Sequence, residues 1–127
     1  MTEPRFLLDT NILVYLIGGL SDRLRERVEE HEPGMVATSA LCVAEALYGI
    51  SDGREKEALD RLLKVIEPLP FALAEAQRFP ELPFKRGRLD RLIAAHALAR
   101  DMTIVTNSER DFSDVPGLVI ENWTLAA

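Results

Sequence analysis

Four acidic residues stand where their side chains could do chemistry together. Asp9 interrupts the apolar stretch FLLDTNILVYL, and Glu45 is the only charged residue in ATSALCVAEALYGI. Asp90 lies near the start of LDRLIAAHALARD, and Asp111 follows the apolar stretch TIVT. Crowded carboxylates raise one another's pKa unless a cation neutralises them. If the four converge, they predict a site for Mg²⁺ or Mn²⁺, which bind carboxylate oxygens, leave positions open for phosphate oxygens and support phosphodiester hydrolysis.

Short apolar stretches alternate with helical patterns along the 127 residues. Apolar residues three and four positions apart predict amphipathic helices, for example over 21–32 and 89–101. Such alternation is typical of a parallel sheet covered by helices on both sides. We therefore predict an α/β fold, a three-layer α/β/α sandwich with a mostly parallel central sheet of four to five strands, in a single domain over residues 1–127. The expected strands are 6–8, 35–38, 66–69, 103–106 and a last one within 117–123.

This fold would bring two of the acids to one edge of the sheet. The carboxyl ends of parallel strands share an edge, where ligands usually bind. Asp9 directly follows the first strand, and Asp111 lies in the loop after TIVT. Each has a simpler explanation, because Asp9 is a good N-cap for the next helix and Asp111 could cap or pair in a loop. Asp90 is likewise favoured by the dipole of its own helix.

Glu45 makes the stronger case, because its helix is apolar almost all round. We expect such a helix to be largely buried. A buried carboxylate costs several kcal/mol unless a cation, a metal or dense hydrogen bonding offsets the loss of water. Glu45 is therefore expected to pair with a basic side chain or to belong to a functional acidic cluster.

Charge and composition exclude several classes of protein. A net charge of −6 opposes binding nucleic acid by bulk electrostatics, and the densest basic cluster, KRGRLDR, is interpreted as a solvated loop and helix start. A single cysteine excludes an internal disulfide and a cysteine metal cluster. No apolar stretch approaches the length of a membrane span, and the N-terminus does not resemble a signal peptide, so we expect a cytoplasmic protein.

Four blocks of the sequence resemble the PIN-domain ribonucleases, and among them the VapC-type toxins of bacterial type II toxin–antitoxin pairs. They are FLLDTNILVYL, ATSALCVAEALYGI, LDRLIAAHALARDMTIVTNSERDF and VPGLVIENW, in the order of that family. The resemblance assigns catalytic roles to Asp9, Glu45, Asp90 and Asp111, and direct metal contact to Asp9 and Asp90. The polar residues that it implies around them are Thr10, Asn11, Ser39, Thr106 and Asn107.

The resemblance also implies an activity and partners. It implies a PIN-like metal-dependent endoribonuclease that uses Mg²⁺ or Mn²⁺ and hydrolyses tRNA or another structured RNA. It further implies a homodimer and a small antitoxin protein that blocks the active site, with operator DNA bound only through the antitoxin.

The sequence bears on three other functions. A phosphoacceptor receiver domain would have an acidic pair after the first strand and a lysine after a late one, and neither is present in the expected place. An aspartyl phosphatase would carry a second acid at position 11, where this chain has Asn11. A PIN-like module that binds RNA or protein through a weak or degenerate metal site is compatible with the sequence.

Overall fold

The sheet of this protein is entirely parallel. The computed structural model describes residues 3–83 and 88–125, and within them five strands pair in the order β3-β2-β1-β4-β5. Parallel pairing needs a crossover between successive strands, which the helices supply. The predicted α/β sandwich is confirmed, and the described residues form five strands, the larger of the two numbers expected. They are β1 (Phe6–Leu8), β2 (Val36–Ser39), β3 (Glu67–Leu69), β4 (Thr103–Val105) and β5 (Ile120–Glu121).

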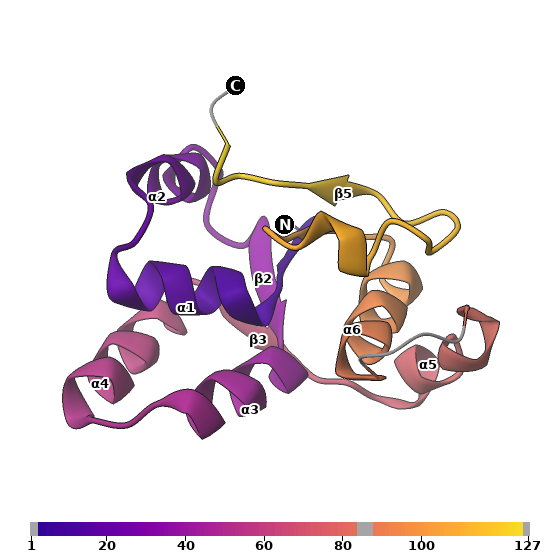
Figure 1. The fold of residues 1–127 in the computed structure, drawn as a ribbon, viewed down its shortest axis with the longest axis horizontal. Coiled ribbons are helices and arrows are strands. Elements are labelled where there is room, and N and C mark those ends of the chain that lie inside the picture. The colour runs from indigo at the N-terminus through magenta and orange to yellow at the C-terminus, as the bar shows by residue number, and fades with distance from the viewer. Residues whose placement is uncertain (1–2, 84–87, 126–127) are drawn as a thin grey trace.

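Helices lie on both sides of this sheet (Figure 1). In that view α1, α2 and α4 lie on one side and α5 and α6 on the other, with α3 below them. None of the helices within the described residues combines the length and the apolar character that crossing a membrane requires. The helices are α1 (Thr10–Gly18), α2 (Asp22–Glu29), α3 (Ala40–Gly49), α4 (Gly53–Leu62), α5 (Leu73–Ala76) and α6 (Arg88–Ala99), with 3₁₀ turns η1 (Phe79–Glu81) and η2 (Glu109–Asp111).

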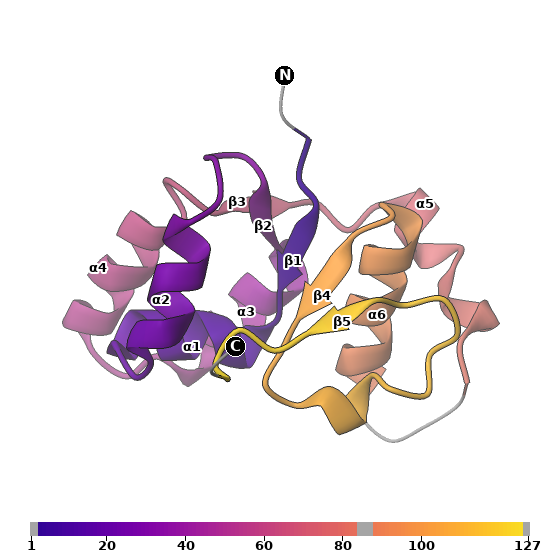
Figure 2. The same ribbon diagram turned by 90° about the horizontal axis from the view of Figure 1, so that it is seen from above.

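The central strand fixes where a ligand can bind. Leu8, the last residue of β1, is paired with Thr38 of β2 on one side and Val105 of β4 on the other. The chain leaves β1 toward β2 and later returns to the opposite side of β1 as β4 (Figure 2). Ligand sites of parallel sheets form where the strand order reverses in this way. That point lies between the carboxyl ends of β1 and β4.

Helix α3 is less buried than its composition predicted. Within it only Cys42 and Ala46 are buried, and Glu45 is exposed. Its outward side carries Leu47 and Tyr48, whose exposed fractions are 43% and 94%. The prediction was wrong because an apolar sequence shows what a helix could bury, whereas the neighbouring elements decide what it does bury.

The C-terminal segment is tied to the rest of the fold by an aromatic cluster. The ring of Trp123, which is 1% exposed, stacks on His31 with centroids 4.8 Å apart and lies 5.1 Å from the ring of Phe6. The guanidinium of Arg27 lies 5.3 Å from the centroid of the same indole. The cluster therefore joins β1, α2 and the segment after β5.

Replacing this tryptophan should destabilise the whole fold. Trp123→Ala removes a buried aromatic side chain that three elements share, and we expect the free energy of unfolding to fall by about 3–5 kcal/mol. Leu125→Ala is the control, because Leu125 is 56% exposed and its loss should change the value by about 0.5 kcal/mol or less. Urea unfolding followed by circular dichroism measures both. Equal effects of the two substitutions would contradict this packing role.

Candidate active site

A polar pocket lies at the carboxyl ends of β1 and β4. Its volume is about 210 Å³. Side chains reach it from the start of α1, from α3, from the first turn of α6 and from the segment after β4. The four carboxylates singled out from the sequence thus lie in one pocket, although they are up to 102 positions apart in the chain. Its lining residues are Asp9, Thr10, Asn11, Glu45, Asp90, Ser108 and Asp111.

Asp9 is the buried member of this group. Only 4% of it is exposed, and both of its carboxylate oxygens accept hydrogen bonds. Oδ1 accepts from the backbone N–H of Ile12 at 3.0 Å, which makes Asp9 the N-cap of α1, and Oδ2 accepts from the hydroxyl of Thr106. Asp9 therefore caps α1 and lines the pocket with the same side chain. Thr106 in turn accepts from the backbone N–H of Ser108 at 2.9 Å, which links the loop after β4 to Asp9.

Burial makes Asp9 hard to ionise. Loss of water raises the pKa of Asp9 from 3.8 to about 6, while the hydrogen bonds from Thr106 and Ile12 act in the opposite direction. The negative charges of Asp90 and Glu45 are smaller causes of the same rise in the pKa of Asp9. The acids are thus close enough to repel one another.

Asp90 responds to the same neighbours. It is half-buried, and its pKa is raised first by this burial and then by the charges of Asp111 and Glu45, against the opposing effect of Arg91. Glu45 and Asp111 are exposed. The pocket therefore combines one deeply buried carboxylate with three that solvent reaches.

The donor set fits a hard divalent cation. Carboxylate and hydroxyl oxygens are what Mg²⁺ and Mn²⁺ prefer, and positive charge would relieve the repulsion that raises the pKa of Asp9 and Asp90. Among residues 3–83 and 88–125, however, no three Asp, Glu, His or Cys side chains lie close enough to form a ready metal-binding group. Binding of a cation by three or more of these carboxylates would therefore require them to move closer together.

Three of the expected lining residues, Ser39, Thr106 and Asn107, do not line the pocket itself. Ser39 is fully buried, where its hydroxyl accepts from the N–H of Leu41 at 3.0 Å and lies 2.8 Å from Nδ1 of His96. Thr106 is buried behind Asp9, and Asn107 does not reach the pocket wall. Thr10 and Asn11 do line the pocket, and so does Ser108, which lies two residues after TIVT.

Arg91 departs most from the sequence-based interpretation. The basic cluster KRGRLDR was expected to be solvated, and Arg88 is exposed, but only 3% of Arg91 is. Lys85 and Arg86 lie outside the described residues. Arg91 is buried because its guanidinium pairs with Asp114, in a loop 23 residues further along the chain.

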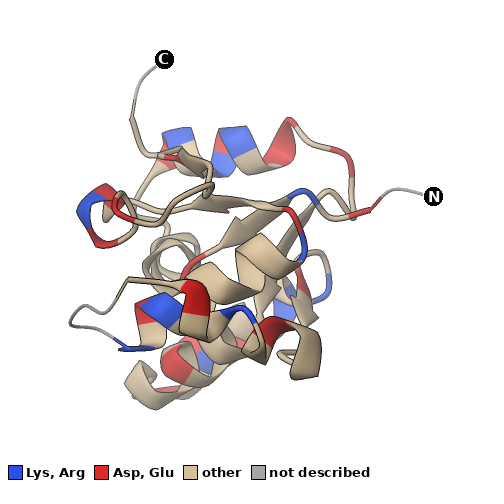
Figure 3. Ribbon diagram, turned by 90° about the vertical axis from the view of Figure 1, so that its right-hand side faces the viewer, with Lys and Arg blue, Asp and Glu red and all other residues tan. Residues whose placement is uncertain are grey.

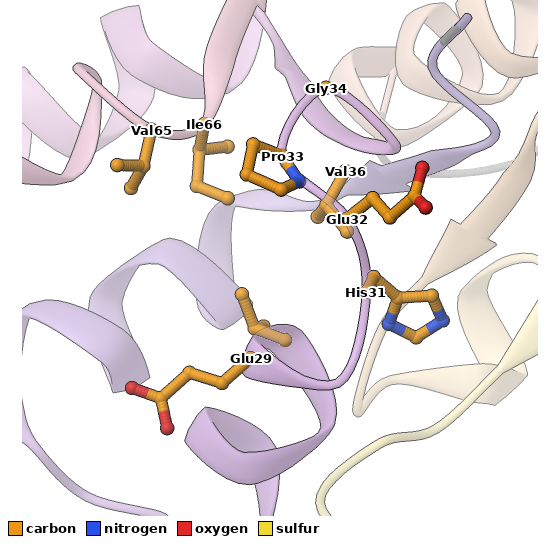
Figure 4. Close-up of a pocket in the computed structure, with 9 residues that line it drawn as sticks. Glu29, His31, Glu32, Pro33, Gly34, Val36, Val65 and Ile66 are labelled. Atoms are coloured by element: carbon orange, nitrogen blue, oxygen red, sulfur yellow. The ribbon is translucent and has the colours of Figure 1, made fainter.

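A second pocket has a different character. It has a volume of about 350 Å³ and is bordered by the end of α2, the segment before β2 and the residues before β3. In Figure 4 apolar side chains such as Val65, Ile66 and Pro33 lie across from Glu29 and His31. It lies away from the carboxyl ends of β1 and β4 and contains none of the four candidate acids.

Comparison with known proteins identifies the family. Residues 6–118 match the PIN domain. The chain belongs to the PIN domain family. The chain is 34% identical to Ribonuclease VapC2 of Rickettsia felis, over 93% of this chain and 97% of that one. It is 30% identical to the tRNA(fMet)-specific endonuclease VapC of Salmonella typhimurium, over 94% of this chain and 98% of that one.

Two solved structures share the observed fold. The structure of VapBC2 from Rickettsia felis, bound to a DNA fragment from its promoter, has a TM-score of 0.83 and 31% identity, covering 93% of this chain and 98% of that one. The DNA-bound VapBC from Salmonella typhimurium also has a TM-score of 0.83, with 26% identity and coverage of 94% and 98%. The resemblance seen in the sequence is thereby confirmed.

Neutralising Asp9 should stabilise the metal-free protein. Because its folded-state pKa of about 6 exceeds the ordinary value of 3.8, the folded protein binds more protons than the unfolded chain between these values. Asp9 therefore contributes most to stability below about pH 4, and this contribution is lost as pH rises through about 6. Asp9→Asn keeps the cap on Ile12 and removes the buried charge. We expect a gain of about 1–3 kcal/mol at pH 7 that vanishes near pH 4.

Urea unfolding in chelator, at pH 4 and at pH 7, measures this difference. Asp101→Asn is the matched control, because Asp101 is exposed at the far end of α6 and its positive φ of 54° suits asparagine. A destabilised Asp9→Asn variant at pH 7 would contradict the view that desolvation dominates at this carboxylate.

Proposed function

We propose that this protein is a metal-dependent endoribonuclease that hydrolyses phosphodiester bonds of RNA and acts as the toxin of a toxin–antitoxin pair. One observation carries the proposal: acids from four separate elements line one polar pocket at the strand-order reversal of the sheet. Membership of the PIN domain family, and relatives named ribonucleases, support it. The relative named a tRNA(fMet)-specific endonuclease supports RNA, including tRNA, as the class of substrate.

The residues of the pocket would have different roles in binding the cation and orienting the substrate. Asp9 and Asp90 would hold a Mg²⁺ or Mn²⁺ ion, with Glu45 and Asp111 completing its surroundings. When bound, such an ion polarises the phosphodiester, activates a water and stabilises the leaving oxygen. The Thr106 hydroxyl and the Ile12 N–H fix the Asp9 carboxylate, so that ordering it costs little when substrate arrives. Asn11 and Ser108 offer neutral polar groups at the rim, suited to orient the substrate.

The partners form part of the same proposal. A small antitoxin protein would block the pocket, and operator DNA would be bound only through it, in line with the DNA-bound VapBC neighbours. The exposed apolar side chains of α3, Leu47 and Tyr48, support a homodimer. We further propose that residues 1–127 form a single domain and that the protein works in the cytoplasm.

Cleavage of RNA should depend on the cation and on both proposed ligands. The chain, freed of any partner, should cleave RNA in Mg²⁺ or Mn²⁺ and stop when chelator is added. Asp9→Asn and Asp90→Asn should each lower the rate by about 100-fold or more, because each removes a charged ligand and leaves the fold intact. Gel analysis of cleaved RNA measures the rate, and Asp101→Asn is again the matched control.

Two outcomes would contradict the proposal. Activity that survives both substitutions would show that the pocket is not the catalytic site. RNA binding without cleavage in any divalent metal would instead favour a PIN-like binding module with a degenerate metal site.

A further inference from the structure

Asp111 is held in the pocket by a short piece of structure. It is the last residue of η2, which has three residues and no side-chain hydrogen bond at its N-cap. Its carboxylate is exposed. The following residue, Phe112, is buried at 1% exposure and anchors the segment to the core, but an apolar contact does not fix how the backbone at Asp111 is turned.

Arg91 adds a directional contact to this segment from outside η2. It follows Asp90 in the first turn of α6, and its guanidinium reaches across to the segment after β4. Nη1 lies 3.0 Å from Oδ1 of Asp114, and Nη2 donates a hydrogen bond to the backbone carbonyl oxygen of Asp111. The side of the molecule with α6 is shown in Figure 3, where acidic and basic positions are interspersed.

The guanidinium of Arg91 is only 3% exposed, so its burial has to be compensated by polar contacts. Taking a cation out of water costs several kcal/mol, which good partners must offset. The planar fork of arginine can hold a carboxylate with one nitrogen and a carbonyl with another. Here the carboxylate of Asp114 orients the Arg91 guanidinium, and the guanidinium in turn holds the backbone carbonyl of Asp111.

We infer that Arg91 is a positioning residue of the candidate active site: held by Asp114, it binds the backbone of Asp111 and thereby keeps the Asp111 carboxylate in the pocket with Asp90. The inference rests on the proposed nuclease function for its catalytic consequence, although the contact itself can be tested without it. Neighbouring positions 90 and 91 of α6 thus have complementary roles. Asp90 faces the pocket, and Arg91 holds the segment that supplies the opposing acid.

Arg91→Lys separates this role from charge alone. Lysine keeps the positive charge, but a single ammonium cannot reproduce the two-nitrogen fork. Hydrogen exchange should show the amide hydrogens of Asp111 and Phe112, which bond to Ser108 and Glu109, exchanging at least about 10-fold faster. Amides of the central strand β1 should keep their rates. Arg100→Lys, at the exposed far end of α6, is the matched control and should change neither rate.

A double-mutant cycle tests whether the effect passes through Asp111. Arg91→Lys should slow RNA cleavage about 10-fold in the wild-type background but less than about 2-fold in an Asp111→Asn background, because the carboxylate that it positions is already gone. Should Arg91→Lys fail to fold, Asp114→Asn removes the charged partner of the fork and should give the same pattern.

The outcomes are distinct for the two proposals. Equal slowing of cleavage in both backgrounds overturns the positioning role, as do unchanged exchange rates in η2. If the wild-type chain cleaves no RNA in any divalent metal, the nuclease proposal fails, and hydrogen exchange alone decides whether Arg91 holds Asp111.

Discussion

The site depends on the burial of one carboxylate at the end of the central strand. β1 is paired on both sides, so its end cannot move without disturbing β2 and β4. Asp9 follows that end, and only 4% of it is exposed. Removing a carboxylate from water is costly, and the cost is only partly offset by the Ile12 N–H and the Thr106 hydroxyl. Natural folds retain such a destabilising buried carboxylate mostly where function requires it. The roles proposed for the other three acids depend on this fixed charge.

Topology explains how acids so distant in sequence meet. The chain runs outward from β1 through β2 to β3 and then returns to the far side of β1 as β4, which places the segment after β4 beside the end of β1. The same return brings the start of α6, with Asp90, over this edge. The hydrogen bond from Thr106 to Asp9 links this returning part of the chain to the end of β1. Within the returning part, Arg91 links α6 to the segment after β4 through the carbonyl of Asp111. The pocket lies between the end of β1 and the returning part, and both supply its wall.

Sequence patterns were sufficient where local rules decide the structure. The strand before Asp9, its helix cap and the alternation of elements follow from apolar runs and capping chemistry, and all are present in the structure. The burial of α3 was wrong, because tertiary neighbours decide which apolar face is covered. Ser39 turned inward to meet His96, 57 positions away, and Arg91 was buried by Asp114 in a distant loop. Pairings of this kind depend on how elements pack and have no local signature.

The central claim is that the acids around Asp9 form one divalent cation site. Anomalous diffraction from crystals of the protein soaked in Mn²⁺ tests it most directly, because the ion is located independently of any activity. We expect a peak about 2 Å from carboxylate oxygens of Asp9 and Asp90, with Glu45 and Asp111 turned toward it. A protein that cleaves RNA in Mn²⁺ but shows its peak elsewhere, or none in this pocket, would contradict the account.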